Sequence, residues 1–172
     1  GRAAEKPMTV RRIIPWPHAC LRSPAAQVTE INDEIRKLWD DMITTMDAMP
    51  GVGLAAPQIG VALQVAVVDA SKGRDKRIRL ANPVVIDASA IMNEYDEASP
   101  NLPGISAKIR RPRGVKVQYL DEQGDTVTRD FVGLEATSVQ HQIDHLAGKM
   151  FFDNLSKTRR DILLRKARKF KI

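Results

Sequence analysis

The stretch Gln140-His141-Gln142-Ile143-Asp144-His145-Leu146 holds two of the chain's three histidines. His141 and His145 are four residues apart, so on a helix both imidazoles lie on one face, where they can share a metal ion. In the metalloprotease motif with this spacing, a glutamate that acts as general base follows the first histidine. Here that residue is Gln142, whose carboxamide can hydrogen-bond a water molecule but cannot take its proton near neutral pH. The alternative is a pair of ordinary core or surface histidines, because such motifs also arise by accident.

The residues around this stretch predict a buried helix. Glu135 can lie in its first turn, and Gly148 is a natural residue just past its end. Val139, Ile143 and Leu146 recur at spacings of four and three, which gives the helix an apolar face. The histidines are therefore expected inside the domain.

The composition predicts one soluble globular domain over residues 1–172, with 43% hydrophobic and 28% charged residues. No apolar run is long enough to span a membrane, and no membrane partner is expected. Residues 1–8 are too short and polar for a secretory signal, so we expect an extension or an artificial addition before a native start at Met8. Cys20 is the only cysteine, which excludes an internal disulfide and favours a cytoplasmic location.

The N-terminal third predicts an extended segment, a helix and a tight loop. Residues 11–28 are proline-containing with short apolar runs and should wrap over the surface. Thr29 is the expected cap of a helix that ends at Pro50-Gly51. Its apolar stripe is typical of core packing and consists of Ile31, Ile35, Leu38, Trp39, Met42 and Met46. The following loop, Gly51-Val52-Gly53-Leu54-Ala55-Ala56-Pro57-Gln58-Ile59-Gly60, fits neither a phosphate loop nor a dinucleotide fingerprint. From the residues alone it is an ordinary turn in which only Gln58 offers both a donor and an acceptor.

The middle of the chain predicts short strands without crossover helices, so the sheets should be mostly antiparallel. Residues 121–125 form the expected hairpin turn. The segment 97–104 contains Ser99-Pro100 and predicts a strand end and a turn. Two or three small sheets around the histidine helix give an α+β architecture. The predicted strands are residues 63–69, 77–81, 84–87, 91–97, 105–110, 115–120 and 127–132.

The C-terminal segment predicts a basic helix that Ser156 can cap. Much of the net charge of +6 lies here. A solvated helix face and a charge-driven contact with RNA both remain open. The basic residues of this helix are Lys157, Arg159, Arg160, Arg165, Lys166, Arg168, Lys169 and Lys171.

Three stretches in this order, residues 51–60, 97–104 and 140–146, closely resemble the motifs of the peptide deformylase family. The resemblance covers nearly the whole sequence, from Ile13-Ile14-Pro15 to the basic last helix. Members of that family are metal hydrolases that remove the formyl group from the N-terminal formyl-methionine of new polypeptides. The resemblance therefore implies the deformylase fold, a divalent metal, usually Fe²⁺ or Zn²⁺, and a formyl-Met peptide or nascent-chain N-terminus as partner. It also supports a ribosome contact through the C-terminal helix.

The resemblance implies a role for several residues of this sequence. His141, His145 and Ser99 stand at the three metal-ligand positions, where the family's second motif, Glu-Gly-Cys-Leu-Ser, has a cysteine instead of Ser99. Gln58 and Pro100 stand at the two positions that bind the formyl oxygen in the family, the first through its side chain and the second through a backbone N–H. Gln142 stands at the position of the catalytic glutamate in Gln-His-Glu-x-x-His. The resemblance also assigns substrate contacts to Val52, Gly53, Glu97 and Ala98.

The departures from the family motifs fall on the chemistry. Ser99 offers a neutral hydroxyl where a thiolate would hold the metal, and proline has no N–H at position 100. Loss of a general base costs about 10²–10⁴ in rate and loss of one oxyanion donor about 10²–10³. We therefore expect a deformylase-fold pseudoenzyme with strongly impaired or lost activity and weak or absent metal. The alternatives are an active deformylase with an atypical site, in which water or Asp144 replaces the base, a metallohydrolase with another substrate, and a non-catalytic module that binds nascent chains or the ribosome.

Overall fold

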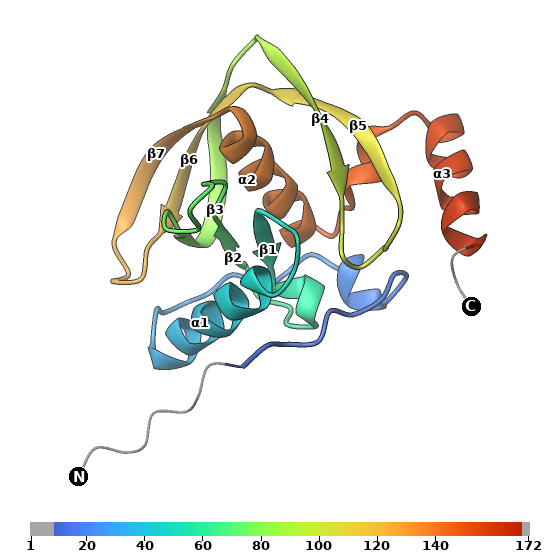
Figure 1. The fold of residues 1–172 in the computed structure, drawn as a ribbon. Helices are drawn as coiled ribbons and strands as arrows, with labels where there is room; N and C mark the ends of the chain where they lie inside the picture. The colour runs from blue at the N-terminus through green and yellow to red at the C-terminus, as the bar shows by residue number, and fades with distance from the viewer. Residues whose placement is uncertain (1–8, 170–172) are drawn as a thin grey trace.

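Helix α2 (Gly133–Leu146) crosses the centre of the molecule, with strands on both sides of it (Figure 1). We describe residues 9–169 of a computed structural model of the chain. The expectation for residues 1–8, and Lys171 of the basic helix, lie outside these residues. The other helices are α1 (Asp33–Asp47) and α3 (Lys157–Lys169), and short 3-10 turns lie at Ala19–Leu21, Ala56–Ile59 and Phe151–Asn154.

Two antiparallel sheets confirm the α+β prediction. The larger has the order β1-β2-β3-β6-β7, and the smaller pairs β4 with β5. The strands are β1 (Gly53–Ala55), β2 (Val65–Val68), β3 (Ile78–Ala88), β4 (Met92–Ala98), β5 (Ser106–Pro112), β6 (Gly114–Leu120) and β7 (Thr126–Val132).

Strand β3 differs from the prediction because it joins two expected strands into one. The separate strands 77–81 and 84–87 were expected on either side of Asn82-Pro83. Instead, Asn82 adopts a left-handed conformation with φ 49°, and the register against β6 shifts between Ala81 and Val84. The chain thus continues through a bulge, since an irregularity of this kind bends a strand without ending it.

Helix α1 begins later than the sequence predicts. Its N-cap is Asn32, whose side chain accepts a hydrogen bond from Ile35 N at 3.0 Å, so the assignment of Thr29 as cap was wrong. Both residue types cap helices, but only Asn32 stands three residues before the N–H that it satisfies. The buried face includes Trp39, fixed by a bond from its indole N–H to Ala66 O at 3.1 Å.

The end of α2 is held against the N-terminal segment. Gly148 has φ +79°, and a Cβ on it would lie 2.9 Å from the backbone carbonyl of Arg22, so only glycine fits. Ala25 N donates to Leu146 O, and Trp16 N donates to Asn101 O, both at 2.9 Å. The segment before α1 therefore wraps over the domain as expected and docks onto residues more than eighty positions further along the chain.

The C-terminal helix packs by Leu163 and Ala167 against the cluster that includes Phe151 and Phe152. Ser156 accepts a hydrogen bond from Arg159 N at 3.3 Å, which confirms it as the cap. The exposed basic side chains of α3 are Lys157, Arg159, Arg165, Lys166, Arg168 and Lys169. Within residues 9–169, no helix combines the length and apolar character that a membrane span requires.

Candidate active site

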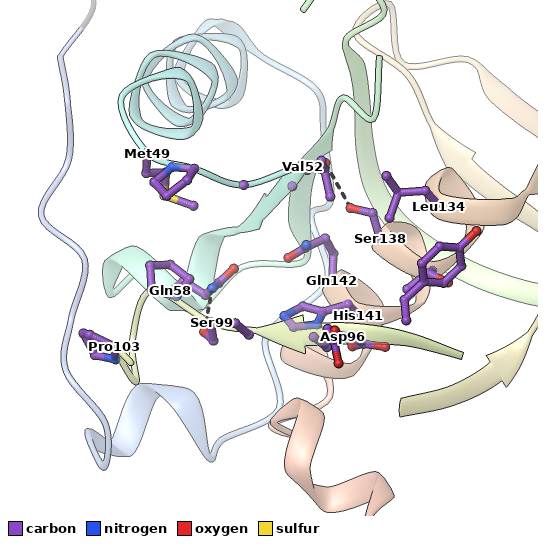
Figure 2. Close-up of a pocket in the computed structure, with 18 of the residues that line it drawn as sticks. Met49, Val52, Gln58, Asp96, Ser99, Pro103, Leu134, Ser138, His141 and Gln142 are labelled. Carbon is purple, nitrogen blue, oxygen red and sulfur yellow. Dashed lines mark hydrogen bonds and ion pairs between the residues drawn. The ribbon is translucent and has the colours of Figure 1, made fainter. Parts of the chain in front are cut away.

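A cavity of about 850 Å³ opens between the segment leading into β1 and strand β4, and α2 forms its floor (Figure 2). Residues 49–53 and Gln58 form one wall, and residues 95–100 with Pro103 and Gly104 form the other. Two further segments complete the lining. The segment after β2 contributes Ser71 and Arg74, and α2 contributes Leu134, Thr137, Ser138, His141 and Gln142.

The cavity brings together residues that are far apart in the sequence and that the motifs single out. One residue of the set, His145, does not line it and lies behind His141. The members that do line it are Val52, Gly53, Gln58, Glu97, Ala98, Ser99, Pro100, His141 and Gln142.

His141 and His145 face each other through their Nε2 atoms, which are 3.0 Å apart. The Nδ1 atom of His141 lies 2.8 Å from Glu97 Oε1 and donates to it, since an ionised carboxylate can only accept. Burial lowers the pKa of His145 well below its ordinary value, and the neighbouring His141 and Arg111 lower it further. The Nε2 atoms of the two imidazoles are thus held close together, with His141 at the cavity floor and His145 behind it.

Glu97 links this histidine pair to Arg111 on β5. The Arg111 guanidinium donates to both carboxylate oxygens of Glu97, from Nε to Oε2 at 2.7 Å and from Nη2 to Oε1 at 2.9 Å. Its Nη1 donates to Asp144 Oδ2 at 2.9 Å. Burial alone would raise the pKa of Glu97, but the hydrogen bonds from His141 and Arg111 and the charge of Arg111 hold it below its usual value. Glu97 is consequently a buried, ionised anchor that orients His141.

Asp144 is not placed to replace the missing base. It points toward Arg111 and Asn154, and it does not line the cavity. The alternative in which Asp144 takes a proton from a water molecule at the reacting centre therefore lacks the required geometry.

Ser99 and Gln58 are tied to each other through Asn101. The side-chain oxygen of Asn101 accepts from Gln58 Nε2 and from Ser99 Oγ, both at 2.8 Å, and Gln58 Nε2 also lies 3.3 Å from Ser99 Oγ. The amide of Asn101 is fixed in turn by donating to the backbone oxygens of Ile14 at 2.6 Å and Gln58 at 3.1 Å. Ala55 N donates to Gln58 Oε1 at 2.9 Å, so the whole Gln58 side chain is immobilised.

Gln142 lies on the cavity wall with only 4% of its surface exposed. Its Oε1 is buried without a hydrogen-bond partner among the described residues. Its Nε2 lies against Gly53, where a Cβ would approach Nε2 to 2.5 Å and Ser138 Oγ to 2.6 Å. Gly53 is therefore required by the close approach of α2, and Ser138 secures the contact by donating to Val52 O at 3.0 Å (Figure 2).

The side chains present do not reproduce the three-ligand metal set that the resemblance implies. The two Nε2 atoms converge as a shared ion would need, but Ser99 keeps its proton and donates it to Asn101. A neutral hydroxyl is a weak ligand for Fe²⁺ or Zn²⁺. Among residues 9–169, no group of three or more His, Cys, Asp or Glu side chains is arranged to hold a metal ion.

Sequence reasoning missed two residues that organise this site. Arg111 is one of three basic residues in β5, and its only sequence signal is an apolar-face position, in phase with Ile109. Asn101 is a mild departure from the serine of the family's second motif, but its role as a polar side chain that bonds its neighbours in a turn was not predicted. Neither pairing partner could be read from the sequence, because each contact spans at least fourteen residues.

Comparisons with known proteins agree with the fold. The family model for polypeptide deformylase matches residues 10–161. A peptide deformylase of Phenylobacterium zucineum is 41% identical over 164 residues, which are 94% of this chain and 97% of that protein. A peptide deformylase of Pelagibacter ubique is 40% identical over 166 residues, covering 95% and 96%.

The solved structures that superpose on this chain are also peptide deformylases. The crystal structure of a peptide deformylase from Legionella pneumophila superposes with a TM-score of 0.88 at 36% identity, covering 95% of this chain and 96% of that one. The Ehrlichia chaffeensis peptide deformylase in complex with actinonin gives 0.89 at 34% identity, covering 95% and 99%. The chain therefore belongs to the polypeptide deformylase family.

Proposed function

We propose that this protein binds peptide N-termini in the cavity and hydrolyses an N-formyl group weakly or not at all. The observation that carries the proposal is Gln142, a carboxamide buried on the cavity wall beside His141. A group without proton affinity cannot act as general base at this position.

Peptide binding is supported by two free strand edges that border the cavity. β1 is the end strand of the five-stranded sheet, and β4 pairs only with β5 among the described strands. An extended peptide can add to such an edge by main-chain hydrogen bonds while its first side chain enters a pocket. The formyl-Met peptides and nascent chains on which deformylases act are extended ligands of this kind.

The loss of hydrolysis is supported by two further groups. Pro100 has no N–H for a developing oxyanion, and Ser99 offers no anionic anchor for Fe²⁺ or Zn²⁺. Since a missing base costs about 10²–10⁴ and a missing oxyanion donor about 10²–10³, little turnover should remain. The competing function is ordinary deformylase activity, which the names of the relatives favour.

We also propose that α3 contacts the ribosome or its RNA. Six exposed cationic side chains on one 13-residue helix, with an apolar side buried in the domain, support this second function. Cationic helices bind RNA phosphates by releasing counterions.

The test measures formate release and peptide binding on the same preparation, with Fe²⁺ or Zn²⁺ supplied. We expect saturable binding of Met-peptides and formate release near background. Ala98→Trp should abolish binding because Ala98 lines the cavity, whereas Thr128→Trp, at an exposed position on β7, should not. Formate release at the rate of an active deformylase would refute the loss of hydrolysis. Binding that survives Ala98→Trp would place the ligand elsewhere.

A further inference from the structure

The two ends of the Gln142 carboxamide have different surroundings. Its Oε1 is buried and has no hydrogen-bond partner among residues 9–169. Its Nε2 is not buried in this way, and it too lacks a partner within the described part of the chain. Because Gln142 lines the cavity, the end that a ligand can reach is the amide nitrogen, which has two protons to donate.

Packing holds this carboxamide in place. A Cβ on Gly53 would lie 2.5 Å from Gln142 Nε2 and 3.1 Å from its Cδ, so the amide lies directly against the Gly53 backbone. The side chain therefore has little conformational freedom left to lose when a ligand binds. A donor that is held in position before binding gives more affinity than one that must first be ordered.

The wall across the cavity from Gln142 offers no comparable donor (Figure 2). Both amide protons of Gln58 have acceptors, Asn101 Oδ1 at 2.8 Å and Ser99 Oγ at 3.3 Å. The hydroxyl proton of Ser99 goes to Asn101 Oδ1. Pro100 contributes no N–H. Of these residues, Gln142 is the one whose protons remain available to an acceptor on a ligand.

The same region is poorly suited to a free ammonium group, which carries only donors. Asn101 Oδ1 and Gln58 Oε1 already accept hydrogen bonds from within the protein. Arg74 and Asp96 bring one charge of each sign to the lining, and the carboxylate of Glu97 is already in an ion pair. An ammonium that enters the cavity therefore gives up water without finding a free acceptor on this wall.

We infer that Gln142 is a binding residue whose Nε2 donates to the carbonyl oxygen of an acyl cap, formyl or acetyl, on a peptide N-terminus. The cavity then retains an acylated peptide in preference to the same peptide with a free α-ammonium group. The inference rests on the proposed function, because it names the chemical form of the N-terminus bound at that same site. One hydrogen bond from a donor that is otherwise without a protein partner accounts for about tenfold in affinity.

The experiment compares four forms of one Met-peptide by calorimetry on the full chain: N-formyl, N-acetyl, free amine and desamino. The desamino form is uncharged and has no acyl oxygen, so it separates the contribution of the oxygen from the removal of the positive charge. Both acyl forms should bind about tenfold more tightly than the free-amine and desamino forms. A formate assay on the same samples checks that the formyl peptide stays intact.

Two substitutions remove the donor. Gln142→Met keeps an unbranched side chain, and Gln142→Leu is a second variant in case the first is unstable. Each should lower the affinity for the acyl peptides to that for the desamino form. Gln140→Met is the matched control and should keep the preference, because Gln140 is a buried glutamine of the same helix that does not line the cavity. Thermal melts check that each variant is folded.

The outcomes separate the inference from the function on which it rests. Equal binding of all four forms, tighter binding of the free amine, or a desamino form that binds as tightly as the acyl forms overturns the inference and leaves the proposed function standing. A preference that persists in a folded Gln142 variant overturns the assignment to this donor. A preference for the formyl form alone overturns the inclusion of acetyl. If no form shows binding that Ala98→Trp abolishes, both the inference and the proposed function are wrong.

Discussion

Nε2 of His141 and Nε2 of His145 lie 3.0 Å apart, so a single proton can join the two rings. Metal binding at this position would have to displace that proton and would gain only two neutral nitrogen ligands. Because thiolate ligands supply much of the affinity of such sites, the pair alone should hold an ion poorly.

We therefore predict that the purified protein contains less than one equivalent of Fe²⁺ or Zn²⁺. Ser99→Cys should raise the metal content, since it supplies a thiolate at the third position. Metal analysis after dialysis against a chelator provides the measurement. One tightly held equivalent in the unmodified protein would contradict the prediction.

The chemistry should be restored only when the motifs are repaired together. The triple variant Ser99→Cys, Pro100→Leu, Gln142→Glu regains a ligand, an N–H and a base, and it should release formate from formyl-Met peptides well above the parent. Each single change should give almost nothing, because residues that act as one unit are strongly non-additive. The measurement is a formate assay on parent, singles and triple with metal supplied.

The result of this repair also reports on the cavity. A folded, metal-loaded triple variant that stays inert would mean that the cavity has been remodelled beyond the three motif positions. Adding Asn101→Ser to the triple variant separates these explanations, because it shortens the side chain that holds Gln58.

Ribosome binding should depend on the charge of α3. Changing Lys157, Arg159, Arg165, Lys166 and Lys169 to Gln should reduce cosedimentation with ribosomes, and the binding of the parent should fall steeply with salt. Five Gln changes at other exposed cations, Lys108, Arg110, Lys116, Arg129 and Lys149, are the matched control. Equal losses in both variants would indicate a general charge effect, and no loss in the α3 variant would leave the helix as a solvated surface.

Asp41 predicts a defined pH dependence of stability. Burial would raise its pKa, but hydrogen bonds from Lys37, Thr9 and Arg11 lower it below 3.8. A depressed folded-state pKa means that the unfolded state binds the proton more tightly, so the stabilisation is present above pH 3.8 and is lost as the pH falls through the folded-state pKa. Asp41→Asn should cost about 1–3 kcal/mol in denaturant titrations at neutral pH. The difference in free energy of unfolding between the parent and the variant should stay constant down to about pH 5 and shrink only below that. A difference that already shrinks between neutral pH and about pH 5 would contradict the lowered pKa of Asp41.

Periodicity located most elements of the fold, and the motifs located most of the cavity. The spacing of Val139, Ile143 and Leu146 is a local property of α2, so it could be read directly from the sequence. Pairs of residues that are distant in sequence and in contact only in the fold could not be predicted in this way. The bulge at Asn82 depends on pairing with β6, and the N-cap of α1 depends on which polar residue reaches a free N–H.

The same division applies to the candidate site. The substitutions at positions 99, 100 and 142 stand out because motif positions are defined along the chain. The hydrogen bond by which Asn101 holds Gln58 does not stand out in the sequence. It requires Ile14, Gln58 and Asn101 to be brought together from three segments. Residue identity at a motif position therefore indicates which chemical group differs from the family motif, and the packing around it determines which hydrogen-bonding groups remain available in the cavity.

The docking of the N-terminal segment onto the end of α2 has a consequence for synthesis of the protein. Ala25 N donates to Leu146 O, and Arg22 pairs with Asp153, so residues 22–25 meet these partners only after residue 153 has been synthesised. Contacts of such long sequence separation form slowly, because a large loop must close before they are made. During translation, the apolar side chains that this segment covers remain without their cover until residues beyond 153 have left the ribosome. Folding of the domain is thus a late event, which gives chaperones at the exit tunnel a long period in which to act.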